Sequence, residues 1–273
     1  MPAESRDQQV TTLVDLDFLN PLVAADLRRF GDKGDGGYLA PETPIKISDA
    51  LLSFGLGNNW SFEKALADFN PDLSVHAYDH SVSGDQFRWK YWKSLVKFFL
   101  RIETLAGVRK SLKLHQSYTS FFQGRVQHFI GLISDQQDQP FFVTPEQAFS
   151  RLKDASNIVL KIDIEGSEYR IIEQVLDYKD KLTVVIVEFH NTDVFRPVFV
   201  KLIMMMAESF DIVHLHGNNF RSAAADGLPI VLEITFQHKR FTRSPLRRCT
   251  LPIEGMDYSN CPSRPDFSLR FKD

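Results

Sequence analysis

The sequence is poor in cysteine and in long hydrophobic runs. Only Cys249 and Cys261 occur among its 273 residues. Two thiols are too few for a disulfide scaffold or for a zinc site of four thiolates. The first twenty residues contain no apolar stretch of signal-peptide length, and no run elsewhere approaches the length of a membrane span. These absences favour a cytoplasmic protein over a secreted or membrane-spanning one.

The chain also lacks an excess of either charge, internal repeats and low-complexity tracts. Its formal net charge is −3 and its pI is near 6.2, so the overall charge gives no reason to expect a nucleic-acid partner. Hydrophobic residues make up 43% of the chain and charged residues 25%, an ordinary globular composition. The length suits one large α/β domain with additions, and it leaves the oligomeric state open.

Short apolar runs alternate with amphipathic stretches along the chain. The runs predict seven strands, at residues 49–57, 73–80, 126–134, 157–163, 182–190, 211–217 and 229–237. Helical spacing occurs at residues 61–69, 84–106, 144–155, 167–178 and 197–210, with Thr144 as an N-cap and with Pro145 and Pro197 opening their helices. Continuous apolar strands are typical of a mostly parallel sheet covered on both faces. The pattern therefore predicts a doubly wound, Rossmann-like α/β fold, with the last strand antiparallel at or near the edge.

The regions outside this alternation divide the chain into three parts. Residues 1–30 form an N-terminal segment that is weakly ordered up to residue 20 and then contains a short amphipathic helix at residues 21–30. Residues 31–240 form the main domain, which opens with a glycine-rich turn and a brief extended piece. Residues 241–273 contain four prolines and little periodicity, so we expect an irregular tail packed on the domain.

Glycines and one acid follow the first two predicted strands. The first strand ends at Gly55 and Gly57, and the second ends at Asp79, twenty-two residues beyond Gly57. Ligands of open α/β sheets bind beyond the carboxyl ends of the strands. Glycine allows a tight turn and a close approach of the backbone to a ligand, and an acid at this spacing accepts both hydroxyl hydrogens of a ribose. The spacing favours a nucleoside-containing cofactor over an ordinary turn.

The glycine pattern differs from the three-glycine dinucleotide fingerprint. Trp60 occupies the position of the third glycine, which counts against NAD. S-adenosylmethionine is the better fit to this pattern.

The fourth predicted strand runs into the acidic segment "IDIEGSEY". Glu165 and Glu168 lie in the turn and the first helical turn that follow, where acids stabilise the helix dipole by about 0.3–1 kcal/mol each. This local role suffices for Glu168. It does not account for Asp163, which precedes the helix and is expected at the same sheet edge as the glycines.

Histidines follow the next two strands. Period-two alternation places Glu188 and His190 on one side of the fifth strand, and His216 lies at the end of the sixth. We expect Asp163, His190 and His216 to reach one crevice. Together they could form a general base with its orienting partners or the ligands of a divalent metal, although a hydrogen-bonded structural role is the commoner fate of a single histidine.

Five segments in order resemble the FkbM-type S-adenosylmethionine-dependent methyltransferases. They are "GDGGYLAP", "SFGLGNNWSFEKALA", "LKIDIEGSEYRII", "VEFHN" and "HLHGNNF…LPIVLEITF", and the similarity runs from about Arg29 to Gln237. The proline-rich ending is also similar to tails in one branch of that family. The resemblance implies a class I methyltransferase fold and methylation of a hydroxyl on a sugar, polyketide or similar small molecule.

By position, the resemblance implies that Gly55, Gly57 and Asp79 hold the cofactor, with Asp163 at its methionine end. Ser53 departs from this resemblance, because the common family pattern has an acid at that position. The leading hypothesis is therefore an S-adenosylmethionine-dependent O-methyltransferase of a small-molecule or glycan acceptor. A metal-dependent hydrolase built on Asp163, His190 and His216, and a non-catalytic binding protein on the same fold, are the alternatives.

The segment between the second and third strands, at about residues 81–125, is predicted to be a basic helical insertion. Residues 81–128 contain nine Lys or Arg against two acids, and Lys93, Lys97 and Arg101 share one side of a helix. A solvated face on a packed helix explains such a stripe. The alternatives are contact with an anionic acceptor or with an anionic membrane surface.

Overall fold

The computed structural model describes residues 9–12, 16–248 and 250–271. Much of the N-terminal segment expected to be weakly ordered, namely residues 1–8 and 13–15, lies outside this part, as does Cys249. Within it, no helix is both long enough and apolar enough to span a lipid bilayer.

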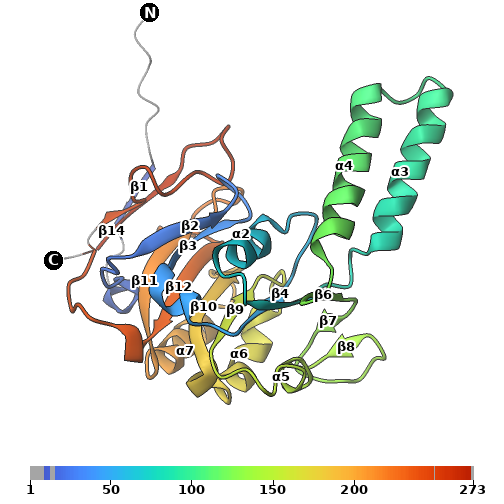
Figure 1. Ribbon diagram of the computed structural model, residues 1–273. Coiled ribbons are helices and arrows are strands. Elements are labelled where there is room, and N and C mark those ends of the chain that lie inside the picture. Colours follow the sequence, from blue (N-terminus) through green and yellow to red (C-terminus); the bar gives the residue numbers. More distant parts are fainter. Residues whose placement is uncertain (1–8, 13–15, 249, 272–273) are drawn as a thin grey trace, which may run out of the picture.

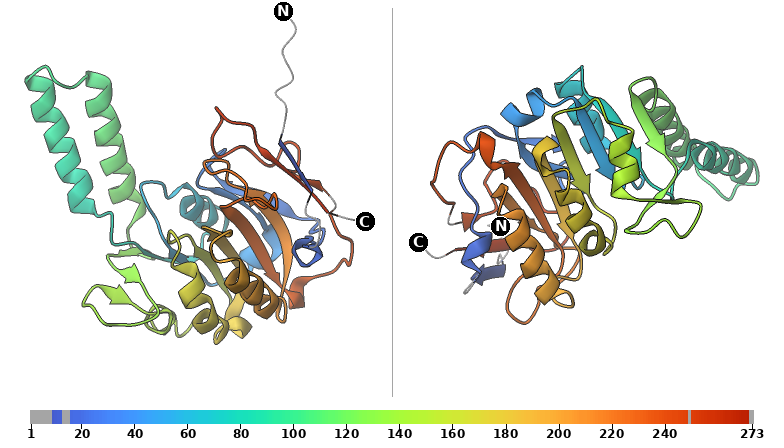
Figure 2. Two further views of the ribbon diagram at one scale, coloured as in Figure 1. Left: turned by 180° about the vertical axis from the view of Figure 1, so that it is seen from behind. Right: turned by 90° about the horizontal axis from the view of Figure 1, so that it is seen from below.

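A seven-stranded sheet runs through the centre of the molecule (Figures 1 and 2). Its strands in spatial order are β11 (Phe210–Gly217), β12 (Leu232–His238), β10 (Leu182–Phe189), β9 (Ile158–Ile162), β4 (Ala50–Phe54), β5 (Ser74–Tyr78) and β6 (Val126–Phe129). Among these seven strands, β12 alone runs in the opposite direction, and it pairs antiparallel with both β10 and β11. The prediction of a mostly parallel sheet whose last strand is antiparallel and near the edge is thus confirmed.

Apolar elements cover both faces of the sheet, as the continuous apolar strands require. One face packs against α5 (Pro145–Ser150), α6 (Glu168–Leu176) and α7 (Arg196–Met206). The other packs against α1 (Glu42–Lys46), α2 (Ser61–Phe69) and the hairpin of β2 (Leu27–Gly31) and β3 (Gly37–Pro41). The expected cap of α5 is confirmed, because the Thr144 side chain accepts a hydrogen bond from the backbone N–H of Gln147.

The helix expected at residues 21–30 is not formed. Leu27–Gly31 is strand β2, which pairs antiparallel with β3 in a register that joins Leu27 to Pro41 and Gly31 to Gly37. Gly31 has a φ of 93°, in the left-handed region, and the following glycines close the turn between the two strands. The glycine-rich turn therefore makes a hairpin with the residues before it, which the helical spacing of residues 21–30 did not reveal.

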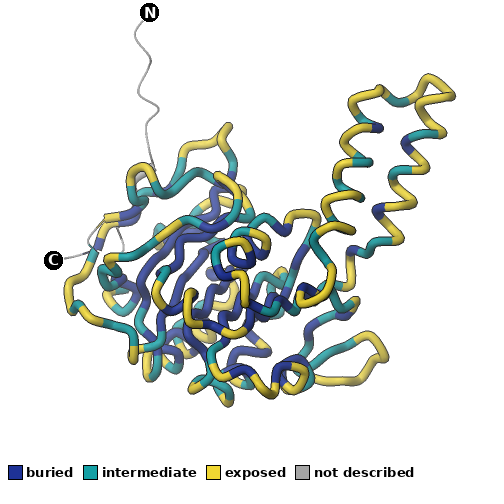
Figure 3. Tube along the Cα trace, viewed as in Figure 1, coloured by how far each residue is buried: buried dark blue, intermediate teal, exposed yellow. Residues whose placement is uncertain are grey.

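The single helix expected at residues 84–106 is instead two helices, α3 (Gly84–Phe99) and α4 (Leu105–Phe121). The chain reverses after α3, where Arg101 has a φ of 62°. The Thr104 hydroxyl then accepts a hydrogen bond from the backbone N–H of Gly107 at 3.1 Å and so caps a new helix. The two helices project from the domain as a pair (Figure 1), and most of their surface is exposed (Figure 3).

The remaining elements are short. They comprise β7 (Leu132–Ile133), β8 (Phe142–Val143) and the 3-10 helices Asp17–Leu19, Lys179–Lys181 and Lys239–Phe241. In the C-terminal segment, β13 (Thr250–Leu251) pairs with β14 (Phe267–Arg270), which also pairs with β1 (Gln9–Thr12). Buried apolar side chains from this segment, among them Leu251 and Phe267, join the main core.

Candidate functional site

Period-two alternation brings the polar residues of two adjacent strands to one face. In β9, Val159 faces α2 and the β2–β3 hairpin, and Lys161 and Asp163 follow it at intervals of two. In β10, Ile186 faces the same side, and Glu188 and His190 follow it. Because β9 and β10 run parallel, these side chains meet at the carboxyl edge of the sheet.

The glycine turn after β4 is pressed against the end of β9. The backbone N–H of Asp163 donates to the carbonyl of Phe54 at 2.8 Å. A Cβ atom on Gly55, which has a φ of 85°, would lie 1.7 Å from the Asp163 carbonyl oxygen. Only glycine fits this approach. Gly57 has a φ of 58°, but a Cβ there would meet nothing within 4 Å, so this side of the turn is open.

Asp79 holds the glycine turn in place. Its Oδ2 accepts hydrogen bonds from the backbone N–H groups of Leu56 at 2.9 Å and Gly57 at 2.7 Å, and its Oδ1 accepts from the Ser81 N–H and hydroxyl. Burial raises the pKa of Asp79, but the hydrogen bonds from Ser81, Gly57 and Leu56 outweigh burial and lower the pKa. All four acceptor positions of the carboxylate are therefore in use, so a ribose would have to replace one of these donors.

A buried lysine connects the glycine turn, α2 and the end of β9. The Lys161 ammonium donates to the Gly55 carbonyl at 2.8 Å and lies 3.5 Å from Asp163 Oδ2 and 3.7 Å from Glu63 Oε1. Burial lowers the pKa of Lys161, but Glu63 and Asp163 outweigh burial and raise the pKa. The Ser53 hydroxyl donates to the same Glu63 oxygen at 2.6 Å. Ser53 is therefore fully buried against a carboxylate supplied by α2.

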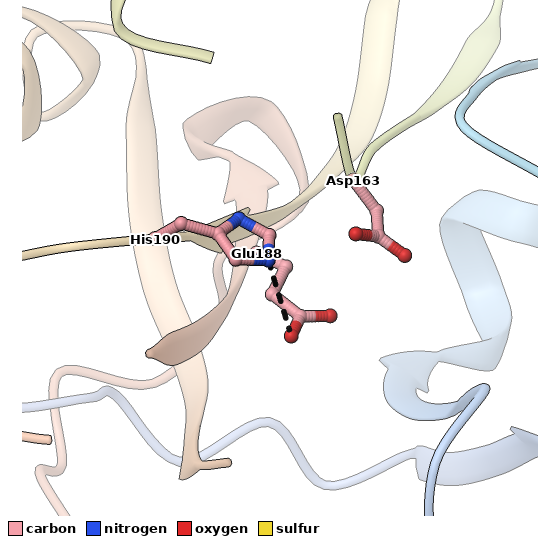
Figure 4. A group of neighbouring side chains, drawn as sticks. All are labelled: Asp163, Glu188 and His190. Carbon is pink, nitrogen blue, oxygen red and sulfur yellow. Dashed lines mark ion pairs between the residues drawn. The ribbon is translucent and has the colours of Figure 1, made fainter. Parts of the chain in front are cut away.

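Asp163, Glu188 and His190 form a cluster at the sheet edge (Figure 4). One donor atom of each lies within 4.8 Å of the others, and His190 Nε2 is 3.8 Å from Glu188 Oε1. The cluster lines a pocket of about 280 Å³ together with Asp35, Glu165, Asn218, Phe220, Arg221 and Val231. The expectation that Asp163 and His190 reach one crevice is confirmed by this arrangement.

Glu168 orients His190 from behind. Its Oε1 accepts a hydrogen bond from the His190 backbone N–H at 2.6 Å and lies 3.3 Å from Nδ1, while its Oε2 accepts from the Gly166 N–H. Glu168 is completely buried. Glu168 lies in the first turn of α6 and binds the turn before it, as expected, but that local role was incomplete. Its carboxylate also holds the imidazole so that Nε2 lies toward Glu188.

The cluster concentrates negative charge around one imidazole. Burial raises the pKa of Glu188 well above its usual value, and the nearby Asp163 and Glu233 raise it further. Burial lowers the pKa of His190, but Glu168 and Glu188 outweigh burial and raise the pKa to about 9. Burial, with Asp163 and Glu188 next, also raises the pKa of Tyr38, so its hydroxyl stays protonated and lies 3.3 Å from Glu188 Oε2. The pocket therefore favours a positive charge.

The three side chains also suit a divalent cation. Two carboxylates and one imidazole are a common donor set for such ions. A ligating histidine usually donates its second ring N–H to a carboxylate, which is the position of Glu168 behind His190. A cation could thus be held by Asp163, Glu188 and His190.

His216 does not share this pocket, so the expectation that it would meet Asp163 and His190 was wrong. Its Nδ1 lies 3.4 Å from Glu233 Oε2 and its Nε2 lies 3.2 Å from Asp266 Oδ2, and the residue is 4% exposed. The physical reason is the sheet order, because β12 lies between β10 and β11 and places Glu233 opposite His216. His216 instead holds the C-terminal segment against the sheet, as His214 does through Asp257.

Several residues of the site were not predicted from the sequence. Glu188 was placed on the side of His190 but given no role, although that spacing already put its carboxylate at the sheet edge. The position of Lys161 also indicated a role in the site. A lysine inside the apolar run "IVLKI" is expected to be buried and therefore to need a buried anionic partner. The contributions of Glu63 and Tyr38 had no such signal, because they come from α2 and β3, which are distant in sequence.

No family model matches the chain, and neither does any curated protein sequence. Similar solved structures include Streptococcus pneumoniae Sp1610 in complex with S-adenosyl-L-methionine, at 13% identity over 75% of this chain and 72% of that one, with a TM-score of 0.36. Precorrin-6y C5,15-methyltransferase from Geobacter metallireducens is 11% identical over 72% and 84%, with a TM-score of 0.35. Protein Atu636 of Agrobacterium tumefaciens, described as a predicted O-methyltransferase, is 8% identical over 84% of each chain, with a TM-score of 0.34.

At these identities the likeness concerns the fold alone. The strand order and the single antiparallel strand carry the fold assignment. The chain has the α/β, Rossmann-like fold of the class I methyltransferases. Membership of the FkbM family remains a resemblance.

The first prediction concerns the buried lysine. Lys161→Met keeps most of the side-chain volume but leaves the Glu63 and Asp163 carboxylates without their cation. Breaking a buried pair from one side costs about 3–5 kcal/mol. We expect a loss of this size in the free energy of unfolding, measured by urea denaturation. The control Lys64→Met breaks the exposed Lys64–Asp68 pair and should cost less than about 1 kcal/mol. Equal losses in both variants would contradict the role given to Lys161.

The second prediction concerns the pH dependence of stability. Burial lowers the pKa of His216, but Asp266 and Glu233 outweigh burial and raise the pKa to about 10, with a further contribution from Asp257. A histidine whose pKa is raised on folding stabilises the protein fully below its unfolded pKa of about 6.5 and loses that effect as the pH rises through 10.

We therefore expect the parent to be more stable than His216→Gln near neutral pH, and the difference to shrink as the pH approaches 10. Urea denaturation of both proteins across this range measures the difference. A gap that stays constant with pH would show that His216 is not held as an imidazolium.

Proposed function

We propose that this protein is an S-adenosylmethionine-dependent methyltransferase that acts on a hydroxyl group of a small-molecule or glycan acceptor. One observation carries the proposal. The contact of Gly55 with the Asp163 backbone brings an open glycine turn beside a cluster of proton-binding side chains. A turn of this kind suits a nucleoside cofactor, and the cluster suits the proton of an alcohol.

Several features of the glycine turn support cofactor binding. The turn is open beyond Gly57, and the amino end of α2 follows it. Asp79 fixes the backbone of Leu56 and Gly57 from one side, which keeps the turn preorganised before a ligand arrives. In this proposal a ribose hydroxyl displaces a Ser81 donor and binds Asp79.

The cluster supports transfer to a hydroxyl. S-adenosylmethionine supplies an activated methyl group when bound, so the protein must align the acceptor and take up its proton. His190 Nε2 lies toward the pocket, and Glu168 fixes the ring that carries it. Asp163 and Glu188 stabilise positive charge at that ring, and Asn218 donates to Glu188 at 2.9 Å, which fixes the carboxylate. His190 accepts the proton in this proposal in its neutral form. Its pKa of about 9 keeps most of the imidazole protonated near neutral pH, so turnover should rise as the pH approaches 9. If a divalent cation were held by Asp163, Glu188 and His190, His190 would ligate it and the cation would lower the pKa of the acceptor hydroxyl instead.

The two alternatives have weaker support. A hydrolase built on Asp163, His190 and His216 loses its third ligand, because His216 is engaged by Glu233 and Asp266. A non-catalytic binding protein has no need of a buried carboxylate behind a pocket histidine. Cofactor binding without turnover on any acceptor would favour it.

The third prediction tests cofactor binding by calorimetry with S-adenosylmethionine. Asp79→Ala removes the acceptor of the turn N–H groups and of the ribose, so we expect binding to weaken by about 2–3 kcal/mol. Gly57→Ala places a methyl group in the open side of the turn and should weaken binding as well.

Gly124→Ala is the matched control for the glycine variant. Gly124 has a φ of 60°, a Cβ on it would also meet nothing within 4 Å, and it lies before β6, at the other end of the sheet. Gly124→Ala should therefore introduce the same backbone strain as Gly57→Ala and leave the affinity for S-adenosylmethionine unchanged. A parent protein without measurable affinity for S-adenosylmethionine would refute the proposed function.

The fourth prediction concerns turnover, followed as methyl transfer from labelled S-adenosylmethionine to mixed sugars and phenols. His190→Gln should lower turnover by about 10²–10⁴-fold while cofactor affinity is kept. Glu168→Gln should cause a smaller loss, because the imidazole loses its anionic partner but remains present. Glu208→Gln is the control, since that side chain is exposed and lies between α7 and β11, away from the pocket. Unchanged turnover in His190→Gln would remove the proposed base.

The role of a cation is decided in the same assay. If chelation abolishes turnover and Mg²⁺ or Mn²⁺ restores it, the cluster acts through a bound ion. If chelation has no effect, the imidazole acts alone.

A further inference from the structure

The pair formed by α3 and α4, here called the helical hairpin (residues 84–121), exposes an unusual number of large apolar side chains. Trp89, Trp92, Val96, Phe99, Leu100 and Ile102 are each more than half exposed. Five of them lie on α3 or directly after it, and Ile102 lies in the turn farthest from the domain (Figure 1). Apolar surface gathered in one place usually marks an interaction site.

The exposed residues of α3 form a second apolar stripe rather than the packing face. Phe87 and Ser94 are buried on the side that meets α4. Trp89, Trp92, Val96 and Phe99 follow one another at intervals of three or four, which places them on one different side of the helix. The stripe is therefore left without a partner by the fold itself, and it continues into the turn.

Positive charge flanks this stripe. The hairpin has eight Lys or Arg against two acids, a net charge of +6, whereas the whole chain has −3. Asp85 pairs with Arg88, and Glu103 makes its hydrogen bond within the turn. On a helical wheel Lys93 and Lys97 follow the apolar stripe on one side, and Arg101 lies in the turn beyond. The hairpin is thus amphipathic along its outer surface.

We propose that the helical hairpin docks the protein onto an anionic lipid surface. Tryptophan prefers the boundary between headgroups and acyl chains, and an apolar stripe with cationic flanks is the pattern of a helix that lies in that boundary. Phe99 at the end of α3, together with Leu100 and Ile102 beyond it, enters the acyl boundary. Lys93, Lys97 and Arg101 meet the lipid phosphates and carboxylates. This proposal rests on the hairpin alone and is independent of the activity proposed above.

The charges disfavour two other occupants. A second copy of the hairpin would bring cations against cations, because its outer surface offers no free acid to meet them. A nucleic acid would suit the cations but would leave the aliphatic side chains of the turn in water. A lipid surface satisfies both the charge and the apolar stripe.

The fifth prediction tests docking with full-length protein and sedimented phosphatidylcholine vesicles, with and without phosphatidylserine. The parent should bind the anionic vesicles at a salt concentration of about 0.15 M and lose binding near 1 M, where charges are screened within about 3 Å. Lys93→Gln, Lys97→Gln and Arg101→Gln together should weaken binding about a hundredfold, at about fivefold for each charge. Trp92→Gln, Phe99→Gln and Ile102→Gln together should abolish it.

Two control variants match these changes elsewhere on the surface. Lys46→Gln, Lys153→Gln and Arg243→Gln remove the same charge, and Phe141→Gln, Met204→Gln and Leu246→Gln remove exposed apolar side chains. Both should bind as the parent does. Fluorescence adds a second readout, because Trp89 and Trp92 are exposed while Trp60 is buried, so brominated lipids should quench the two hairpin tryptophans.

The proposal is overturned if the parent ignores anionic vesicles, or if the control variants lose as much binding as the hairpin variants. Light scattering that finds a dimer, which the apolar variant converts into a monomer, would assign the stripe to self-association and also overturn it. Tighter binding to polyuridylate than to the vesicles would do the same.

Discussion

The buried ammonium of Lys161 is the interaction on which the candidate site depends. Glu63 is fully buried and Asp163 is partly buried, each facing this ammonium, and a carboxylate inside a protein is costly without a cation. Lys161 supplies that cation and also binds the Gly55 carbonyl, so one side chain joins α2, β9 and the glycine turn. The turn and the cluster therefore keep a fixed relation, which methyl transfer between two bound molecules would require.

Much of the fold follows from local patterns. The seven apolar runs predicted strands because parallel strands are buried on both faces. Thr144 and Pro145 predicted the start of α5. The errors arose where the decisive contact is not local. The helical spacing of residues 21–30 could not show that Gly31 and Gly37 would pair these residues with β3, and nothing in the apolar spacing marked Arg101 as the point where the chain reverses.

The candidate site was predictable to the extent that it depends on neighbouring parallel strands. Asp163 and His190 end β9 and β10, which are adjacent, so their meeting followed from strand order. His216 was misjudged because the antiparallel strand β12 inserts between β10 and β11, and an edge position for that strand would have left the two histidines side by side. The contact of Glu168 with His190 could not be predicted from the sequence, since the carboxylate reaches across a turn to another strand.

Trp60 belongs both to the segment after the glycine turn and to the base of the helical hairpin. Its ring packs on Phe87, Tyr118 and Phe122, and its indole N–H donates to Ser117 at 3.2 Å. Insertions are usually detachable because they touch little of their host. The helical hairpin cannot be removed in this way. Replacing it with a short loop would expose the indole ring of Trp60 to solvent. An engineer who shortens the chain here must also redesign position 60, and a homologue without the hairpin should carry a smaller residue there.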